Sequence, residues 1–174
     1  MTRKRISTTT TSDPVRVALA LGGNLGPVEE HFDRALGILA AHLSEIRVAP
    51  IYRTPAVSPI PQPDYLNGAL VARSPTLDAE ALLALCQAIE RSVGRRRGAS
   101  GERWGPRPLD LDLLWFGHRV SPRPEITLPH PRLAERRFVL QPLADLIPDE
   151  LVPGTGRTVR ELLDRLPPEA IERI

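Results

Sequence analysis

Hydrophobic and polar residues alternate in four stretches of the chain, and a period of two is typical of β-strands. The stretches cover residues 15–21, 46–53, 65–73 and 109–116. The first stops at Gly22-Gly23-Asn24, and the second is interrupted or edged at Pro50, because proline donates no hydrogen bond to a neighbouring strand. In the third, the period places Tyr65, Asn67, Ala69 and Val71 on one face.

Apolar residues recur three or four positions apart in four other stretches, and this spacing predicts helices. The predicted helices cover residues 28–41, 78–93, 138–147 and 158–166. Gly94 is a stop signal for the second helix, and Pro167-Pro168 ends the last. The order β-α-β-β-α-β predicts the α+β class: a two-layer, ferredoxin-like core with a mostly antiparallel sheet and additional C-terminal helices.

Length and composition predict one globular domain. The chain has 174 residues, of which 41% are hydrophobic and 25% charged. We expect a single domain over residues 14–174 after a disordered, basic and Ser/Thr-rich tail over residues 1–13. The tail lacks the apolar core of a signal peptide, and no later stretch reaches transmembrane length.

Charge and cysteine content exclude some classes of function. A formal net charge of +2 is too small to imply non-specific binding to nucleic acid or to membranes. Cys86 is the only cysteine, which excludes an intrachain disulfide framework and a cysteine-based zinc cluster. We therefore expect a cytoplasmic protein, monomeric, with small-molecule substrates and with neither nucleic acid nor membrane as a partner.

The candidate chemistry lies in the sequence RWGPRPLDLDLL at residues 103–114. Asp110 and Asp112 share one face of the predicted strand, because residues two apart point the same way. The opposite, core-facing side is expected to carry Leu109, Leu111, Leu113 and Trp115. Converging carboxylates repel each other unless a cation lies between them, and oxygen ligands with open water positions suit magnesium. An edge strand with a solvated polar face is the structural alternative.

Arginines next to this pair favour a phosphate ligand. Arg103 and Arg107 carry guanidinium groups that stay charged and bind phosphate oxygens bidentately. The preceding connection, residues 94–105, holds four glycines, four arginines and a single acidic residue, so we expect a mobile cationic loop that can close over a charged substrate. A solvated surface loop is the alternative reading. Residues 54–64 contain four prolines, which predicts a stiff, extended loop.

Four segments together resemble 6-hydroxymethyl-7,8-dihydropterin pyrophosphokinases. They are LALGGNLG at 19–26, YRTPAVSP through PDYLNGAL at 52–70, RWGPRPLDLDLL at 103–114 and LPHPRLAERRFVLQPL at 128–143. The likeness covers about residues 15–150, and the third segment is the specific one. It implies an enzyme, a diphosphotransferase of folate biosynthesis that transfers pyrophosphate from ATP to the pterin alcohol and releases AMP.

The resemblance also implies a role for individual residues. Two Mg²⁺ ions would be held by Asp110 and Asp112, and the catalytic side chains would be Arg95, Arg107 and Trp104. The pterin would be stacked by Tyr65 and Phe138, hydrogen-bonded by Asn67 and contacted by Thr54, Pro55 and Val57. The co-substrate ATP would be bound by Gln87, Glu90, Arg97, Arg103, His130 and Arg136.

Two departures from the family leave details open. The arginine loop is a few residues longer than in well-known bacterial members, so the matching of Arg95, Arg96 and Arg97 to individual family positions is open. Pro131 stands where some members have a tyrosine, which leaves the packing of adenine open.

The residue pattern alone is also compatible with two other functions. Another Mg²⁺-dependent nucleotidyl- or glycosyltransferase would use a D-x-D pair, but it has no reason to carry a ring clamp of Tyr65, Asn67 and Phe138. A ferredoxin-like RNA-binding module would place aromatic residues on central strands, whereas these strands are chiefly aliphatic.

Overall fold

The computed structural model describes residues 13–58, 61–94 and 105–174. The expected N-terminal tail, apart from its last residue, and the arginine loop from Arg95 to Trp104 lie outside the described residues. The elements are β1 (Val15–Gly23), α1 (Val28–Leu39), β2 (Ser44–Val48), β3 (Tyr52–Thr54), β4 (Tyr65–Ser74), α2 (Ala79–Ser92), β5 (Asp110–Phe116), β6 (Ser121–Arg123), β7 (Ile126–Leu128), a short 3-10 helix (Leu133–Glu135), α3 (Arg137–Leu146), β8 (Leu151–Val152), β9 (Arg157–Thr158), α4 (Val159–Asp164) and β10 (Glu172–Arg173).

The main sheet is built around β1. Its strand order is β10-β3-β4-β1-β5, and β2 pairs with β4 next to β3. All pairings within this sheet are antiparallel, as expected for the α+β class. β1 occupies the centre because its sequence VRVALALGG has a single charged residue, so both of its faces can be buried. The expected split at Pro50 is confirmed, since β2 and β3 are separate strands along β4.

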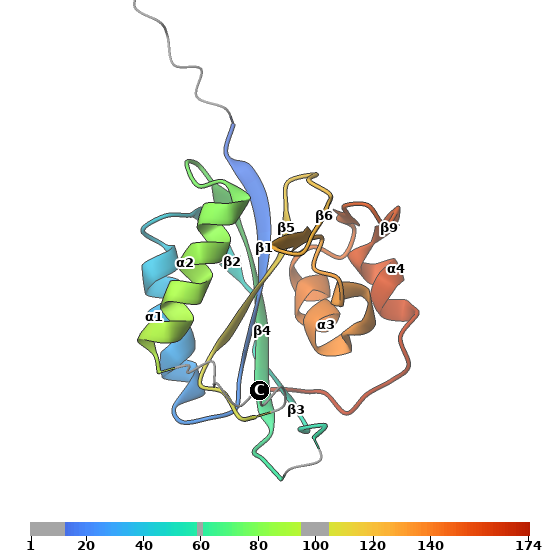
Figure 1. Ribbon diagram of the computed structural model, residues 1–174. Coiled ribbons are helices and arrows are strands. Elements are labelled where there is room, and N and C mark those ends of the chain that lie inside the picture. Colours follow the sequence, from blue (N-terminus) through green and yellow to red (C-terminus); the bar gives the residue numbers. More distant parts are fainter. Residues whose placement is uncertain (1–12, 59–60, 95–104) are drawn as a thin grey trace, which may run out of the picture.

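Helices cover both faces of the sheet, with α1 and α2 on one side and α3 and α4 on the other (Figure 1). One hydrophobic cluster, which includes Leu19 and Leu82, lies on the α1–α2 side. A second cluster, which includes Ala18 and Leu140, lies on the α3–α4 side. The sheet with α1 and α2 therefore forms the expected two-layer core, and the additional C-terminal helices α3 and α4 cover the opposite face (Figure 1). Both faces can be covered because the apolar residues of β1 alternate between leucine or valine and alanine and leave neither face polar.

A β-bulge in β5 changes the predicted faces of that strand. Leu113 pairs with Leu19 and Trp115 pairs with Ala18, so Leu114 is an extra residue. Leu111 and Leu113 join the α1–α2 cluster, whereas Trp115 joins the α3–α4 cluster. The prediction that Trp115 shares a face with the three leucines is therefore wrong, although the residue is buried as expected.

The predicted helices are confirmed, with small shifts at their ends. α2 begins after Asp78, whose side chain accepts from the N–H of Ala81, and is followed by Gly94 at a φ of 91°. α1 ends at Leu39 and α4 at Asp164, each two residues earlier than expected. Within the described ranges, no helix is long and apolar enough to cross a membrane.

Close packing at Gly23 predicts a steric effect on stability. A Cβ atom there would lie 2.6 Å from the carbonyl oxygen of Pro108, whereas one at Gly22 would make only ordinary contacts, the nearest at 3.7 Å. We expect Gly23→Ala to lower the free energy of unfolding by about 1–3 kcal/mol, the usual cost of overpacking. Urea unfolding would measure this, with Gly22→Ala as the matched control, and equal stability of the two variants would contradict it.

Candidate active site

The neighbouring strands β4, β1 and β5 bring the amide of Asn67 and the carboxylate of Asp110 to opposite sides of Gly22. Gly22 on β1 pairs with Asn67 on β4 and with Asp110 on β5. Residues opposite each other in antiparallel strands point to the same face. A Cβ atom on Gly22 would lie 3.7 Å from Oδ1 of Asn67 and 3.8 Å from Cβ of Asp110. The floor between these two side chains is therefore open because residue 22 has no side chain.

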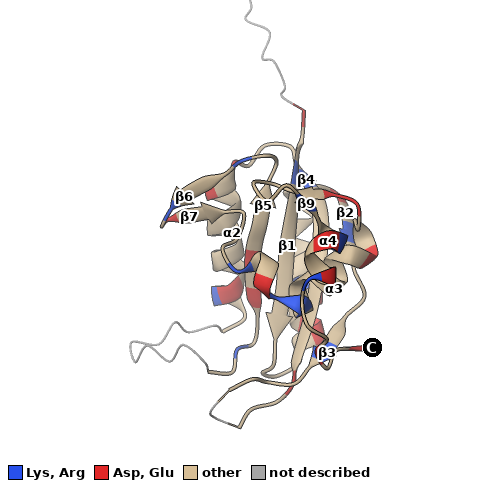
Figure 2. Cartoon of the chain, turned by 90° about the vertical axis from the view of Figure 1, so that its right-hand side faces the viewer, with Lys and Arg blue, Asp and Glu red and all other residues tan. Residues whose placement is uncertain are grey.

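The carboxylates of Asp110 and Asp112 each form an ion pair with an arginine side chain. Nη1 of Arg107 donates to Oδ2 of Asp110 at 2.9 Å, and Nη1 of Arg136 donates to Oδ2 of Asp112 at 3.0 Å. The side chains of Asp110 and Asp112 are 25% and 30% exposed, so both can be reached by a ligand. Basic and acidic segments accordingly adjoin over the region between α2 and α3 (Figure 2).

His130 lies beside the second carboxylate, with Nε2 at 3.7 Å from Oδ2 of Asp112. Its Nδ1 accepts from the backbone N–H of Arg132 at 3.2 Å, so the neutral ring carries its proton on Nε2, toward Asp112. Burial of the imidazole lowers the pKa of His130, and the Asp112 carboxylate opposes this shift. The site therefore presents a neutral N–H donor next to a carboxylate.

The residues expected to bind the pterin lie on the α3 side of the sheet. Nδ2 of Asn67 donates to Oγ1 of Thr54 at 2.9 Å, and both side chains are buried. Tyr65 is on the same face of β4 and is partly exposed. Phe138, in the first turn of α3, packs against the second hydrophobic cluster. The two loop residues of this set, Pro55 and Val57, are exposed.

Arg136 connects the two halves of the site. Besides its bond to Asp112, its guanidinium carbon lies 5.8 Å from the centre of the Phe138 ring, which is within the range of a cation–π contact. The same side chain thus contacts a candidate metal ligand and a candidate stacking ring.

Glu90 has a structural contact that the sequence analysis missed. It is only 3% exposed, and its Oε1 accepts the backbone N–H of Leu111 at 2.8 Å. β5 is the last strand in the sheet order, so its outer side lacks a strand partner in the described chain. Glu90 therefore fixes the edge strand between Asp110 and Asp112. Its expected contact with ATP, and that of the partly exposed Gln87 one turn earlier, stay predictions.

A pocket of about 210 Å³ opens beside Asp112, and the sequence analysis did not predict it. Its lining comes from α2, β5, the β6–β7 hairpin and the turn after β7: Leu83, Asp112, Leu113, Pro124, Glu125, Ile126, Thr127, Leu128, His130 and Pro131. The hairpin strands are three residues each, too short to produce a periodic pattern.

The remaining expected site residues, Arg95, Arg97, Arg103 and Trp104, lie outside the described residues, and their roles stay predictions. Among the residues that are described, no group of three or more His, Cys, Asp or Glu side chains could hold a metal ion.

The fold and the site define a class of protein. Two accessible carboxylates with arginine partners lie between an amide on one side and a pocket with polar and apolar lining on the other. Such a site suits a transferase that acts on a nucleotide polyphosphate and a second, flat substrate.

Comparison with known proteins agrees and is more specific. Residues 18–148 match the family described as 7,8-dihydro-6-hydroxymethylpterin-pyrophosphokinase (HPPK). The chain is 43% identical over 162 residues to the 2-amino-4-hydroxy-6-hydroxymethyldihydropteridine pyrophosphokinase of Pseudomonas aeruginosa, covering 91% of this chain and 96% of that protein. It is 41% identical over 150 residues to the protein of the same name from Synechocystis, covering 85% of this chain and 74% of that protein. The chain belongs to the HPPK family, whose members are diphosphotransferases.

A solved structure supports the fold. The chain is similar to a Plasmodium falciparum HPPK-DHPS variant crystallised with pteroate, with a TM-score of 0.70 and 13% sequence identity. The similarity covers 90% of this chain and 44% of that one. It confirms the ferredoxin-like α+β class.

The Glu90 contact predicts a loss of stability. We expect Glu90→Ala to lower the free energy of unfolding by about 1–3 kcal/mol, because the buried N–H of Leu111 loses its acceptor. Glu90→Gln keeps an acceptor oxygen in the same place and should cost less. Chemical denaturation of both variants would test this, and an equal loss in the two would contradict it.

Proposed function

We infer that the chain transfers the pyrophosphoryl group of ATP to the hydroxymethyl oxygen of 6-hydroxymethyl-7,8-dihydropterin, which gives the diphosphate ester and AMP in folate biosynthesis. Membership of the HPPK family supports this reaction. The structural observation that carries it is the juxtaposition of Asn67, Gly22 and Asp110, which sets a candidate ring reader next to a candidate phosphate site. Family membership does not favour another D-x-D transferase or an RNA-binding module.

We propose that Asp110 and Asp112 hold two Mg²⁺ ions together with ATP. The donor set fits: two partly exposed carboxylates share one face, and Mg²⁺ commonly combines one or two carboxylates with waters and substrate phosphates. Bound ions would neutralise charge on the attacking oxygen and the transferred group. A resident metal fits less well, because two carboxylates alone leave most ligand positions open.

The arginine partners give the site a way to receive phosphate. Arg107 and Arg136 neutralise the carboxylates at distances of 2.9 and 3.0 Å. If the aspartates held a cation, the guanidinium groups would be released from them and could bind phosphate oxygens, for which the planar guanidinium fork allows bidentate contacts. The fixed positive charge then stabilises negative charge that develops during transfer.

The pocket beside Asp112 suits the adenine base of ATP. Leucine and isoleucine side chains from α2, β5 and β7 are among its lining residues, and Pro131 contributes a saturated ring where some family members have a tyrosine. Nε2–H of His130, between the pocket and Asp112, can donate to the ribose or to a phosphate. The pocket volume of about 210 Å³ is compatible with the base alone.

Asn67 suits the hydrogen-bonding edge of the pterin. Because its Nδ2 is occupied by Thr54, its Oδ1 lies toward Gly22 and can accept from a ring N–H or amino group. Tyr65 and Phe138 would stack on the ring from β4 and α3. The cytoplasmic location and the monomeric state stay predictions of the sequence.

The transfer needs no covalent intermediate on the protein. Burial raises the pKa of Cys86, the only thiol of the chain, to about 12, which keeps it protonated and unreactive. The pterin alcohol itself is the nucleophile. Direct transfer of both phosphates predicts AMP, and not ADP, as the nucleotide product.

Removal of either carboxylate should abolish turnover. We expect Asp110→Asn and Asp112→Asn to lower kcat by on the order of 10²-fold or more, because an anionic ligand for the Mg²⁺ that neutralises the phosphates is lost. Formation of AMP and pterin diphosphate with varied Mg²⁺ would measure this, with Asp33→Asn on the exposed side of α1 as control. Formation of ADP with a pterin monophosphate would refute the reaction.

Arg107 should act on the chemical step. We expect Arg107→Ala to reduce kcat by roughly 10²-fold with a smaller change in KM for ATP, the pattern of an interaction that is strongest in the transition state. Steady-state kinetics would show it, with the exposed Arg34→Ala as control. A rise in KM for ATP at unchanged kcat would instead mean that Arg107 only binds the nucleotide.

A further inference from the structure

Asn24 is a buried polar residue for which the site description above gives no role. It follows β1 directly and is 4% exposed. Its backbone N–H donates to the carbonyl oxygen of Arg107 at 2.9 Å, and its Oδ1 accepts the backbone N–H of Arg107 at 2.9 Å. These two bonds attach the segment around Arg107, which we call the phosphate-side segment, to the end of the central strand β1.

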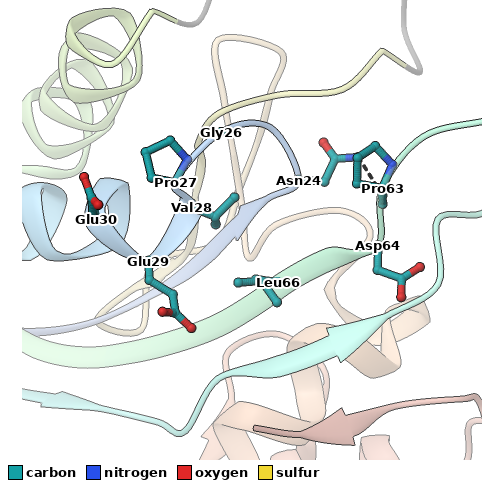
Figure 3. A pocket seen from close by; sticks show the side chains of 9 residues that line it. All are labelled: Asn24, Gly26, Pro27, Val28, Glu29, Glu30, Pro63, Asp64 and Leu66. Atoms are coloured by element: carbon teal, nitrogen blue, oxygen red, sulfur yellow. Dashed lines mark hydrogen bonds between the residues drawn. The ribbon is translucent and has the colours of Figure 1, made fainter.

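The amide nitrogen of Asn24 connects the opposite side of the site. Nδ2 donates to Oε1 of Gln62 at 2.9 Å and to the carbonyl oxygen of Pro63 at 3.0 Å; Figure 3 shows the second bond, on the wall of a pocket of about 320 Å³ near the start of α1. Gln62 and Pro63 belong to the proline-rich connection that leads into β4. The same oxygen of Gln62 also accepts from the hydroxyl group of Tyr65 at 3.3 Å.

These contacts form one chain of hydrogen bonds. It runs from the backbone of Arg107 through Asn24 and Gln62 to the ring hydroxyl of Tyr65. Its partners lie 83 and 38 residues away from Asn24 in the sequence, so the link exists only in the folded protein. One end carries the arginine proposed to act on the phosphates, and the other carries the aromatic ring proposed to stack on the pterin.

The asparagine side chain meets the hydrogen-bonding requirements at this position. The three side-chain bonds need one acceptor and two donors in one plane, which a primary amide supplies. Aspartate has the same shape but no donors, so it would place a carboxylate against two oxygen acceptors. Alanine removes all three bonds and leaves buried polar groups without their partner.

We propose that Asn24 is a positioning residue that makes the binding of ATP and of the pterin interdependent. A ligand that fixes one end of a hydrogen-bonded chain lowers the entropy cost of ordering the other end, and such coupling is reciprocal. The proposal rests on the proposed function, because it takes Arg107 and Tyr65 as contacts of different substrates.

The test compares affinities with and without the second ligand. The dissociation constant of hydroxymethylpterin is measured by calorimetry with and without Mg²⁺ and a non-hydrolysable ATP analogue, and the converse titration is made for the analogue. In the wild type we expect a coupling factor in the range of roughly 5- to 150-fold, typical of linked sites. Asn24→Ala and Asn24→Asp should reduce this factor toward one, while the affinity for each ligand alone changes much less.

Two further variants separate coupling from general stability. Gln62→Leu leaves the Asn24–Arg107 bonds in place and should also reduce the factor, which keeps the test available if a change at Asn24 prevents folding. Ser74→Ala removes another buried side-chain hydrogen bond, from Oγ to the carbonyl oxygen of Leu77, at the far end of β4, and should leave the factor unchanged.

Several outcomes would overturn the proposal. They are an unchanged factor in the folded Asn24 variants or in Gln62→Leu, an equal loss in Ser74→Ala, and the absence of coupling in the wild type. Formation of AMP by the wild type is assayed in parallel, so failure of the coupling is distinguishable from failure of the proposed reaction.

Discussion

The pairing register of β1 with β4 and β5 is the constraint on which the site depends. It sets Asn67 and Asp110 beside Gly22 on the α3 side of the sheet. A slip of one residue in either pairing would turn one of these side chains to the opposite face. The register is well specified because β1 offers leucines to one helical layer and alanines to the other, so a slip would place large side chains in the space of small ones.

The charged side chains of the site differ in solvent exposure, and this difference decides which of them can change partners when a ligand binds. The Arg107–Asp110 and Arg136–Asp112 pairs are partly exposed, and ion pairs in such positions contribute little to stability. The arginines can therefore leave the carboxylates at low cost when a ligand binds. Glu90 is buried against the backbone of β5 and has no such freedom. The buried carboxylate of Glu90 thus holds the backbone of β5 in place, while the partly exposed carboxylates of Asp110 and Asp112 on the same strand can change partners.

The sequence predicted what depends on local periodicity. The spacing of Asp110 and Asp112, the four helices and the order of the long strands follow from patterns of two and of three to four residues. The bulge before Trp115 was not predictable, because Leu114 is apolar like its neighbours and leaves no break in the pattern. The β6–β7 hairpin was missed because its strands are short, and with it the pocket beside Asp112 was missed. The contacts of Asn24 join segments far apart in the chain, which no local pattern encodes.

The segment Gly22-Gly23-Asn24 at the end of β1 superficially resembles a phosphate-binding loop, but its three residues act through packing and hydrogen bonding. Gly22 leaves the floor of the site open between its neighbours. Gly23 allows the backbone at Pro108 to approach to a distance that a Cβ atom would prevent. Asn24 forms hydrogen bonds both to the backbone of Arg107, next to Pro108, and to Pro63 in the proline-rich connection. Each of the three residues thus meets a different physical requirement. Gly23 lets the segment around Arg107 and Pro108 approach β1, Gly22 keeps the space between Asp110 and Asn67 open, and Asn24 links this segment to the proline-rich connection.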